Sequence, residues 1–134
     1  MFVDASALVA LMSSEPEAER IAVALDAAHM PVTSPIAIFE AVLALSRPDK
    51  FGVPVQISHN MLLEFILQRG IQIRDLPPAK TTLDLAVHAA QHYRGGRHGL
   101  NLGDCLHYAF AKFHSMSVLT TDMEFRRTNL QVVD

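Results

Sequence analysis

The chain has one cysteine, a small charged fraction and no long hydrophobic run. A single thiol, Cys105, excludes an intramolecular disulfide and suits a reducing compartment. No apolar run reaches the roughly 20 residues that a membrane-spanning helix needs, and the first residues lack the basic segment of a signal peptide. We therefore expect a cytoplasmic protein with no membrane partner.

The chain also lacks an excess of positive charge. Its formal net charge is −3, so it has no overall attraction for nucleic acid or anionic membranes, and any RNA or DNA contact needs a local basic patch or bridging metal ions. Hydrophobic residues make up 50% of the sequence and charged residues 19%, which excludes a disordered chain. With 134 residues and no repeat, low-complexity tract or linker, the sequence predicts one domain over residues 1–134 with a hydrophobic core.

Short apolar segments alternate with longer segments of helical spacing. The pattern predicts strands over residues 1–4, 30–34, 71–76, 118–120 and 130–133. It predicts helices over residues 5–12, 14–28, 35–47, 55–69, 79–94 and 103–115. Ser14 and Ser34 are the expected N-caps of the second and third helices. Strands joined by helices rather than hairpins pair in parallel, so the sequence predicts a layered α/β fold.

Four acidic residues lie in apolar surroundings: Asp4, Glu40, Asp104 and Asp122. A lone carboxylate there is costly unless it is paired, protonated or bound to a cation. Asp4 and Asp122 each follow an apolar strand, so both should lie at the carboxyl edge of the sheet, where open parallel sheets bind ligands. Carboxylates are hard ligands that suit Mg²⁺ or Mn²⁺. Two such ions can activate a water and stabilise the leaving oxygen in phosphodiester cleavage.

The segments around these acids resemble a known family. They are Phe2-Val-Asp-Ala-Ser-Ala-Leu, Phe39-Glu40, Leu100-Asn-Leu-Gly-Asp-Cys105 and Thr120-Thr-Asp-Met-Glu-Phe125. In order and spacing they are similar to the PIN-domain ribonucleases, specifically the VapC toxins of VapBC toxin–antitoxin pairs. The resemblance implies a PIN-like three-layer fold with a central parallel sheet flanked by helices. It further implies an Mg²⁺- or Mn²⁺-dependent endoribonuclease that cleaves single-stranded RNA, tRNA among the candidates, a homodimer and a cognate VapB-like antitoxin.

The resemblance also assigns residue roles. Asp4 and Asp104 match the metal-binding acids, and Glu40 and Asp122 complete the expected catalytic set. The expected supporting residues are Ser6, Asn101, Thr120 and Glu124. The fourth acid is either Asp122 or Glu124, and we favour Asp122 because it directly follows the strand and Thr120.

Each acid also has a purely structural interpretation. Asp4 could cap the following helix. Asp104 could interact favourably with the dipole at the N-terminus of its own helix, although this would not explain the adjoining Asn101 and Gly103. Glu40 could direct its carboxylate to solvent from an apolar helix. Asp122 could simply be a turn residue.

Other polar residues give weaker signals. The glycine-rich loop and the segment after Asp122 carry cationic side chains that could bind phosphates: Arg94, Arg97, His98 and Arg126. One helical face carries Asp84, His88 and His92. We interpret it as a solvent-exposed face and not as a zinc site, because structural zinc usually needs cysteine ligands and only one cysteine is available.

The alternative function is a non-catalytic PIN-fold module that binds RNA or protein, which the intact acids disfavour. A haloacid-dehalogenase-type phosphatase would need an aspartate where Ser6 stands.

Overall fold

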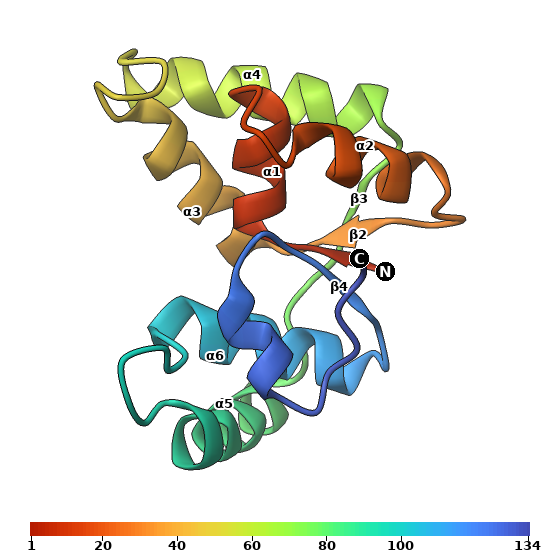
Figure 1. Ribbon diagram of the computed structural model, residues 1–134, viewed down its shortest axis with the longest axis vertical. Coiled ribbons are helices and arrows are strands. Elements are labelled where there is room, and N and C mark those ends of the chain that lie inside the picture. The colour runs from red at the N-terminus through yellow and green to blue at the C-terminus, as the bar shows by residue number, and fades with distance from the viewer.

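The computed structural model describes residues 1–134 and contains one four-stranded sheet between two groups of helices (Figure 1). The strands are β1 (Phe2–Val3), β2 (Val32–Thr33), β3 (Gln72–Ile73) and β4 (Val118–Leu119). Their order is β3-β2-β1-β4, and every neighbouring pair is parallel. The predicted parallel α/β architecture is confirmed.

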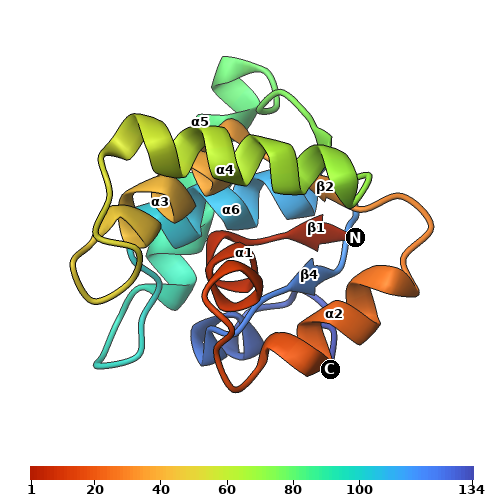
Figure 2. The same ribbon diagram turned by 90° about the horizontal axis from the view of Figure 1, so that it is seen from above.

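The helices form a layer on each face of the sheet (Figures 1 and 2). One layer contains α1 (Ala5–Met12), α2 (Ala18–Asp26), α3 (Pro35–Ser46) and α4 (Val55–Gln68). The other contains α5 (Ala79–Tyr93), α6 (Leu102–Phe113) and the 3₁₀ helix η1 (Met123–Arg127). The two layers meet where α3 contacts α6. None of the helices is long and apolar enough to cross a bilayer.

Alternation along the short strands builds a core on each face of the sheet. Val3 of β1 packs into the core beneath α1–α4, together with Leu8 and Leu45. Its neighbour Phe2 points to the opposite face and packs with Phe110 of α6. Because β1 is buried on both faces, Asp4 directly after it has little exposure to solvent.

The sequence predicts most element boundaries to within a few residues, with three differences. Ser14 does not cap α2, which begins only at Ala18; Ser14 has φ of 53°, whereas an N-cap is extended. The expected strand over residues 130–133 is reduced to one bridge, between Val118 and Val132, because only this residue pairs with β4. The 3₁₀ helix η1 was not predicted, since five residues are too few to show a helical repeat.

Ser34 is the N-cap of α3, as predicted. Its Oγ accepts a hydrogen bond from the backbone N–H of Ala37 at 3.1 Å, and Pro35 follows at the first helical position. This cap begins α3 directly at the carboxyl end of β2. The helix then carries Glu40 towards α6 at the same edge of the sheet.

Candidate active site

Asp4 is the most buried of the four acids, with 1% of its surface exposed. It is the N-cap residue of α1, but its side chain makes no capping hydrogen bond. Instead Oδ2 accepts hydrogen bonds from Ser6 Oγ at 2.8 Å and Thr120 Oγ1 at 2.9 Å. Oδ1 is buried and has no hydrogen-bond partner. One carboxylate oxygen is therefore held by hydroxyls while the other remains available.

Ser6 and Thr120 connect Asp4 to the turn after β4. Ser6 Oγ accepts from the backbone N–H of Thr121 at 3.0 Å, and Thr120 Oγ1 accepts from that of Asp122 at 3.0 Å. Asp122 is the N-cap residue of η1, yet its side chain makes no capping hydrogen bond either. The two hydroxyls thus fix the carboxyl ends of the adjacent strands β1 and β4 relative to each other.

Asp104 lies in the first turn of α6 and has a structural role there. Its backbone N–H donates to Asn101 Oδ1, its own Oδ2 accepts from the backbone N–H of Asn101, and both distances are 2.9 Å. This is a capping box. We argued from the sequence that a structural role of Asp104 at the helix dipole would leave Asn101 unexplained. The capping box explains both residues structurally, because Asn101 is the N-cap. Asp104 Oδ1 takes no part in the box.

Glu40 projects from α3 towards α6 rather than into bulk solvent. Its Oε2 lies 2.6 Å from Nε2 of His107, a buried residue one turn after Asp104. Its Oε1 lies so close to Gly103 that a Cβ at that position would come within 1.8 Å of it. His107 Nε2 is also 3.5 Å from Asp4 Oδ1. The imidazole therefore lies between two of the four acids.

The four acids surround one cavity of about 420 Å³ at the carboxyl edge of the sheet. It is lined by Asp4, Ser6, Glu40, Asn101, Asp104 and Asp122, and on the side of α3 by Glu15, Arg47 and Lys50. Lys50 forms a half-buried ion pair with Glu15, and Arg47 forms an exposed one with Asp49 at 3.2 Å. The cavity thus has an acidic floor and a rim that carries two cationic side chains, each paired with an acid.

The acids perturb one another's protonation. Burial, followed by the charges of Asp4 and Asp104, raises the pKa of Asp122 to about 7. Burial also raises the pKa of Asp104, although the hydrogen bond from Asn101 opposes the change. Burial alone would lower the pKa of His107, but its hydrogen bond with Glu40 and the charge of Asp4 give a net rise.

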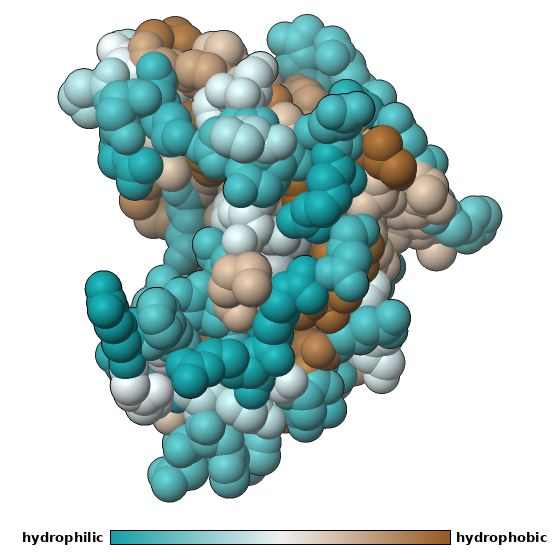
Figure 3. Space-filling model, in the orientation of Figure 1, coloured by the Kyte–Doolittle hydropathy of each residue, from teal (hydrophilic) through white to brown (hydrophobic).

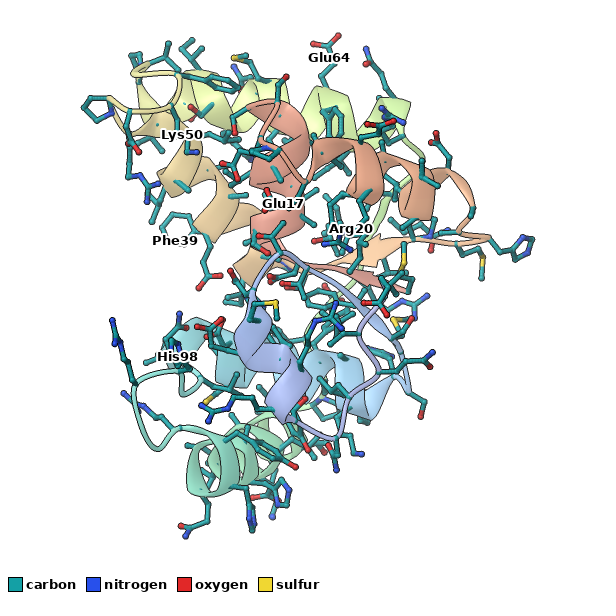
Figure 4. The ribbon with its side chains drawn as sticks, in the orientation of Figure 1. Glu17, Arg20, Phe39, Lys50, Glu64 and His98 are labelled. Atoms are coloured by element: carbon teal, nitrogen blue, oxygen red, sulfur yellow. The ribbon has the colours of Figure 1, made fainter.

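The remaining predicted residues lie outside the cavity. Glu124 lies on η1 with Oε1 4.0 Å from Nδ1 of His98, so the cavity is lined by Asp122 and not by Glu124. The other predicted phosphate-binding residues do not line it either: Arg94, Arg97 and Arg126. Arg94 caps the end of α5, and Arg126 is ion-paired with Asp134. Figure 4 shows His98 on the lower layer, with Phe39 and Lys50 on the upper layer at the same side.

The donor set fits a hard cation, although no three His, Cys, Asp or Glu side chains are grouped closely enough to hold one as they stand. Asp4 Oδ1 is a buried acceptor with no hydrogen-bond partner, and Asp104 keeps one oxygen free of its cap. Burial first, and the neighbouring carboxylates second, raise the pKa of Asp122, and a bound cation would favour its ionised form. Carboxylate oxygens are the ligands that Mg²⁺ and Mn²⁺ prefer.

Sequence reasoning missed Glu15, Arg47 and Lys50, which line the cavity, and His107, which lies behind it against Glu40 and Asp4. His107 follows Asp104 by three positions and so shares its helical face, a spacing that could have identified it. Arg47 and Lys50 belong to the loop between α3 and α4, and no local pattern connects that loop to the acids.

Comparison with known proteins gives one consistent result. The family model described as PIN domain matches residues 1–130. The ribonuclease VapC30 of Mycobacterium tuberculosis is 34% identical to this chain over 145 residues, which cover 99% of this chain and 98% of that protein.

Several solved structures share the fold. The structure of VapC20 of Mycobacterium tuberculosis, described as a sarcin-ricin loop cleaving toxin, matches with a TM-score of 0.77 at 14% identity and covers 98% of this chain and 97% of its own. VapBC2 of Rickettsia felis, bound to a DNA fragment from its promoter, matches with a TM-score of 0.68 at 14% identity and covers 99% of this chain and 96% of the other.

Proposed function

Because this chain belongs to the PIN domain family, we propose that it is a VapC-type endoribonuclease toxin that cuts single-stranded RNA at its acidic cavity. The observation that carries the proposal is the convergence of four carboxylates on one cavity: Asp4, Glu40, Asp104 and Asp122. Whole-length similarity to proteins named as VapC ribonucleases supports the reaction class.

Asp4 and Asp104 are the proposed ligands of Mg²⁺ or Mn²⁺. When bound, such a cation supplies Lewis-acid polarisation of a phosphoryl oxygen and lowers the pKa of water. Ser6 and Thr120 hold Asp4 Oδ2, which leaves Oδ1 without a hydrogen-bond partner, 3.5 Å from His107 Nε2. Asp122 completes the anionic wall, and Glu40 orients the attacking water. Attack on phosphorus in line with the 3′-oxygen breaks the P–O3′ bond and leaves a 5′-phosphate.

RNA would cross the mouth of the cavity between two sources of positive charge. One is the basic rim of Arg47 and Lys50, which lines the cavity. The other is the group predicted from sequence, which lies on the opposite layer: Arg94, Arg97, His98 and Arg126. Cationic side chains on both sides would hold the phosphates that flank the scissile one. Structured RNAs with exposed single strands, tRNA among them, are the proposed substrates.

We also propose two protein partners, a cognate antitoxin and a second copy of the chain. Toxin–antitoxin complexes of Klebsiella pneumoniae and Rickettsia felis share the fold. Apolar side chains remain exposed on two helices of the upper layer, Val23 on α2 and Met61 and Leu67 on α4. In Figure 3 hydrophobic residues lie at the top and along the right side of the face, whereas the lowest part is largely hydrophilic. Light scattering of the purified chain, alone and with its co-expressed antitoxin, tests both; a monomer that binds nothing would contradict them.

The test of the nuclease is cleavage of single-stranded RNAs, including tRNA, by purified antitoxin-free protein. With Mg²⁺ or Mn²⁺ we expect cleavage that EDTA abolishes and that Asp4→Asn and Asp104→Asn reduce by at least about 100-fold, since each removes a charged ligand. The matched control is Asp84→Asn, an exposed acid on α5 paired with Lys80, which should cut normally. A folded wild type that binds RNA without cutting any of them would favour the non-catalytic module.

A further inference from the structure

The carboxylate of Glu40 belongs to α3 but is held by α6. Its Oε2 lies 2.6 Å from His107 Nε2. Its Oε1 occupies the space that a side chain at Gly103 would need, because a Cβ there would come within 1.8 Å of it. The side chain of Glu40 is 38% exposed, so without these contacts it has room to turn towards solvent. The hydrogen bond holds Oε2, and the missing side chain at Gly103 leaves room for Oε1.

His107 is well placed to hold a carboxylate. Its side chain is 1% exposed, and its ring centroid lies 5.6 Å from that of Phe2, which limits rotation of the imidazole. Nδ1 is buried without a hydrogen-bond partner, so Nε2 makes the ring's only hydrogen bond. Because an ionised carboxylate can only accept hydrogen bonds, Nε2 carries a hydrogen and donates a hydrogen bond to Glu40 in either charge state of the ring.

We propose that His107 and Gly103 are positioning residues of the acidic cavity, the imidazole holding one oxygen of Glu40 and the missing side chain making room for the other. The inference rests on the proposed nuclease function, because it explains how Glu40 is directed to the place where a cation and an RNA phosphate would meet. Removing a residue that orients a metal ligand, without itself binding the metal, typically weakens metal affinity by about 10- to 100-fold.

A matched pair of substitutions tests the hydrogen bond. The amide nitrogen of glutamine reaches about as far as Nε2 of histidine, whereas that of asparagine reaches only about as far as Nδ1. In calorimetric titration of antitoxin-free protein with Mn²⁺, His107→Asn should raise the dissociation constant about tenfold. His107→Gln should stay within about threefold of the wild type. Equal effects of the two substitutions, or no effect of either, would overturn the role of His107.

Gly103→Ala tests the second contact. The obstructing atom is the end of a flexible side chain, so the protein should fold normally with its carboxylate displaced. We expect Mn²⁺ affinity to fall about tenfold while Tm stays close to that of the wild type. In a Glu40→Ala background, neither Gly103→Ala nor His107→Asn should weaken binding further. Losses as large in that background as in the wild type would show that these residues act otherwise than through Glu40.

A measurement without metal separates this inference from the proposed function. In the ¹⁵N spectrum of the imidazole rings of EDTA-treated protein, Glu40→Ala and Gly103→Ala should both shift the Nε2 resonance of His107. An unchanged resonance would overturn the inference whatever the protein does to RNA. If the resonance shifts but the wild type binds no Mn²⁺, the metal dependence of the proposed function fails and the positioning of Glu40 stands.

Discussion

Asp122 is the acid whose charge depends most on the rest of the cavity. It follows β4, its backbone is fixed by Thr120, and its carboxylate faces those of Asp4 and Asp104. Burial and the neighbouring charges raise its pKa from 3.8 to about 7. The metal-free protein therefore holds this carboxylate at neutral pH against an unfavourable field, which has a measurable consequence for stability.

Because the pKa of Asp122 is higher in the folded than in the unfolded chain, the folded protein binds the proton more tightly between those two values. Metal-free protein should gain stability from this group as the pH falls from about 8 to about 5.5, and lose it again as the pH rises. The raised pKa of His107 acts in the same direction. Asp122→Asn should raise Tm at pH 8 by about 3–5 °C, roughly the effect of one kcal/mol in a domain of this size, and reduce the difference between pH 8 and pH 5.5. Thermal unfolding in EDTA measures both; an unchanged or lower Tm at pH 8 would contradict the electrostatic account.

Two loops, one on each helical layer, carry the cationic side chains that we propose to bind RNA. The loop between α3 and α4 brings Lys50 to the cavity, where it pairs with Glu15 and lowers the pKa of that carboxyl through a hydrogen bond. The glycine-rich loop between α5 and α6 has an exposed Arg97 and does not line the cavity. Because the loop between α3 and α4 lines the cavity and the glycine-rich loop does not, we expect the first loop to bind the phosphates next to the cleaved bond.

We expect the double substitution Arg47→Gln and Lys50→Gln to raise KM for a short RNA about tenfold, with a smaller change in kcat, because charge is lost beside the scissile phosphate. The matched double substitution Arg94→Gln and Arg97→Gln should raise KM for a short RNA less than the first pair does. Its effect on KM should be larger for a long RNA than for a short one. Steady-state cleavage at two salt concentrations measures this, and the slope of affinity against salt should decrease in both variants. A larger KM effect of the second pair on the short RNA would reverse the assignment.

At the scale of the whole molecule, the cavity lies at the junction of the two helical layers. Asp4 and Asp122 follow the adjacent strands β1 and β4, Glu40 comes from the upper layer and Asp104 from the lower one. A cation held by carboxylates from several elements should therefore stabilise the entire fold and not only one loop.

Mn²⁺ at about 100 times its dissociation constant should stabilise the protein by about 2.7 kcal/mol, since the unfolded chain does not assemble the site. The corresponding rise in Tm should disappear in Asp104→Asn and persist in Asp84→Asn, whose carboxylate lies on the exposed face of α5. Differential scanning calorimetry at fixed protein concentration gives the comparison. An equal rise in Asp104→Asn would mean that the ion binds elsewhere.

Local patterning was enough to predict the order of the strands and helices and the parallel sheet. The short strands are apolar runs, Ser34-Pro35 is a complete start signal for α3, and Gly70 ends α4. The positions of Asp4 and Asp122 directly after strands were also readable, because parallel strands bring their carboxyl ends to one edge. The prediction that Ser14 caps α2 was wrong, because a residue type that favours N-caps does not begin a helix where its backbone is left-handed.

The amino-acid sequence by itself determined which acids could meet, since strand order and helix spacing direct Asp4, Asp104 and Asp122 to one edge. Only the tertiary structure decided how the cavity is completed. His107 contacts Glu40 although the two residues are 67 positions apart in the chain. Gly103 matters only because the carboxylate of Glu40, from another helix, occupies the space that a side chain at position 103 would need. Such contacts depend on how α3 and α6 pack, and packing between distant elements leaves no periodic signal in the chain.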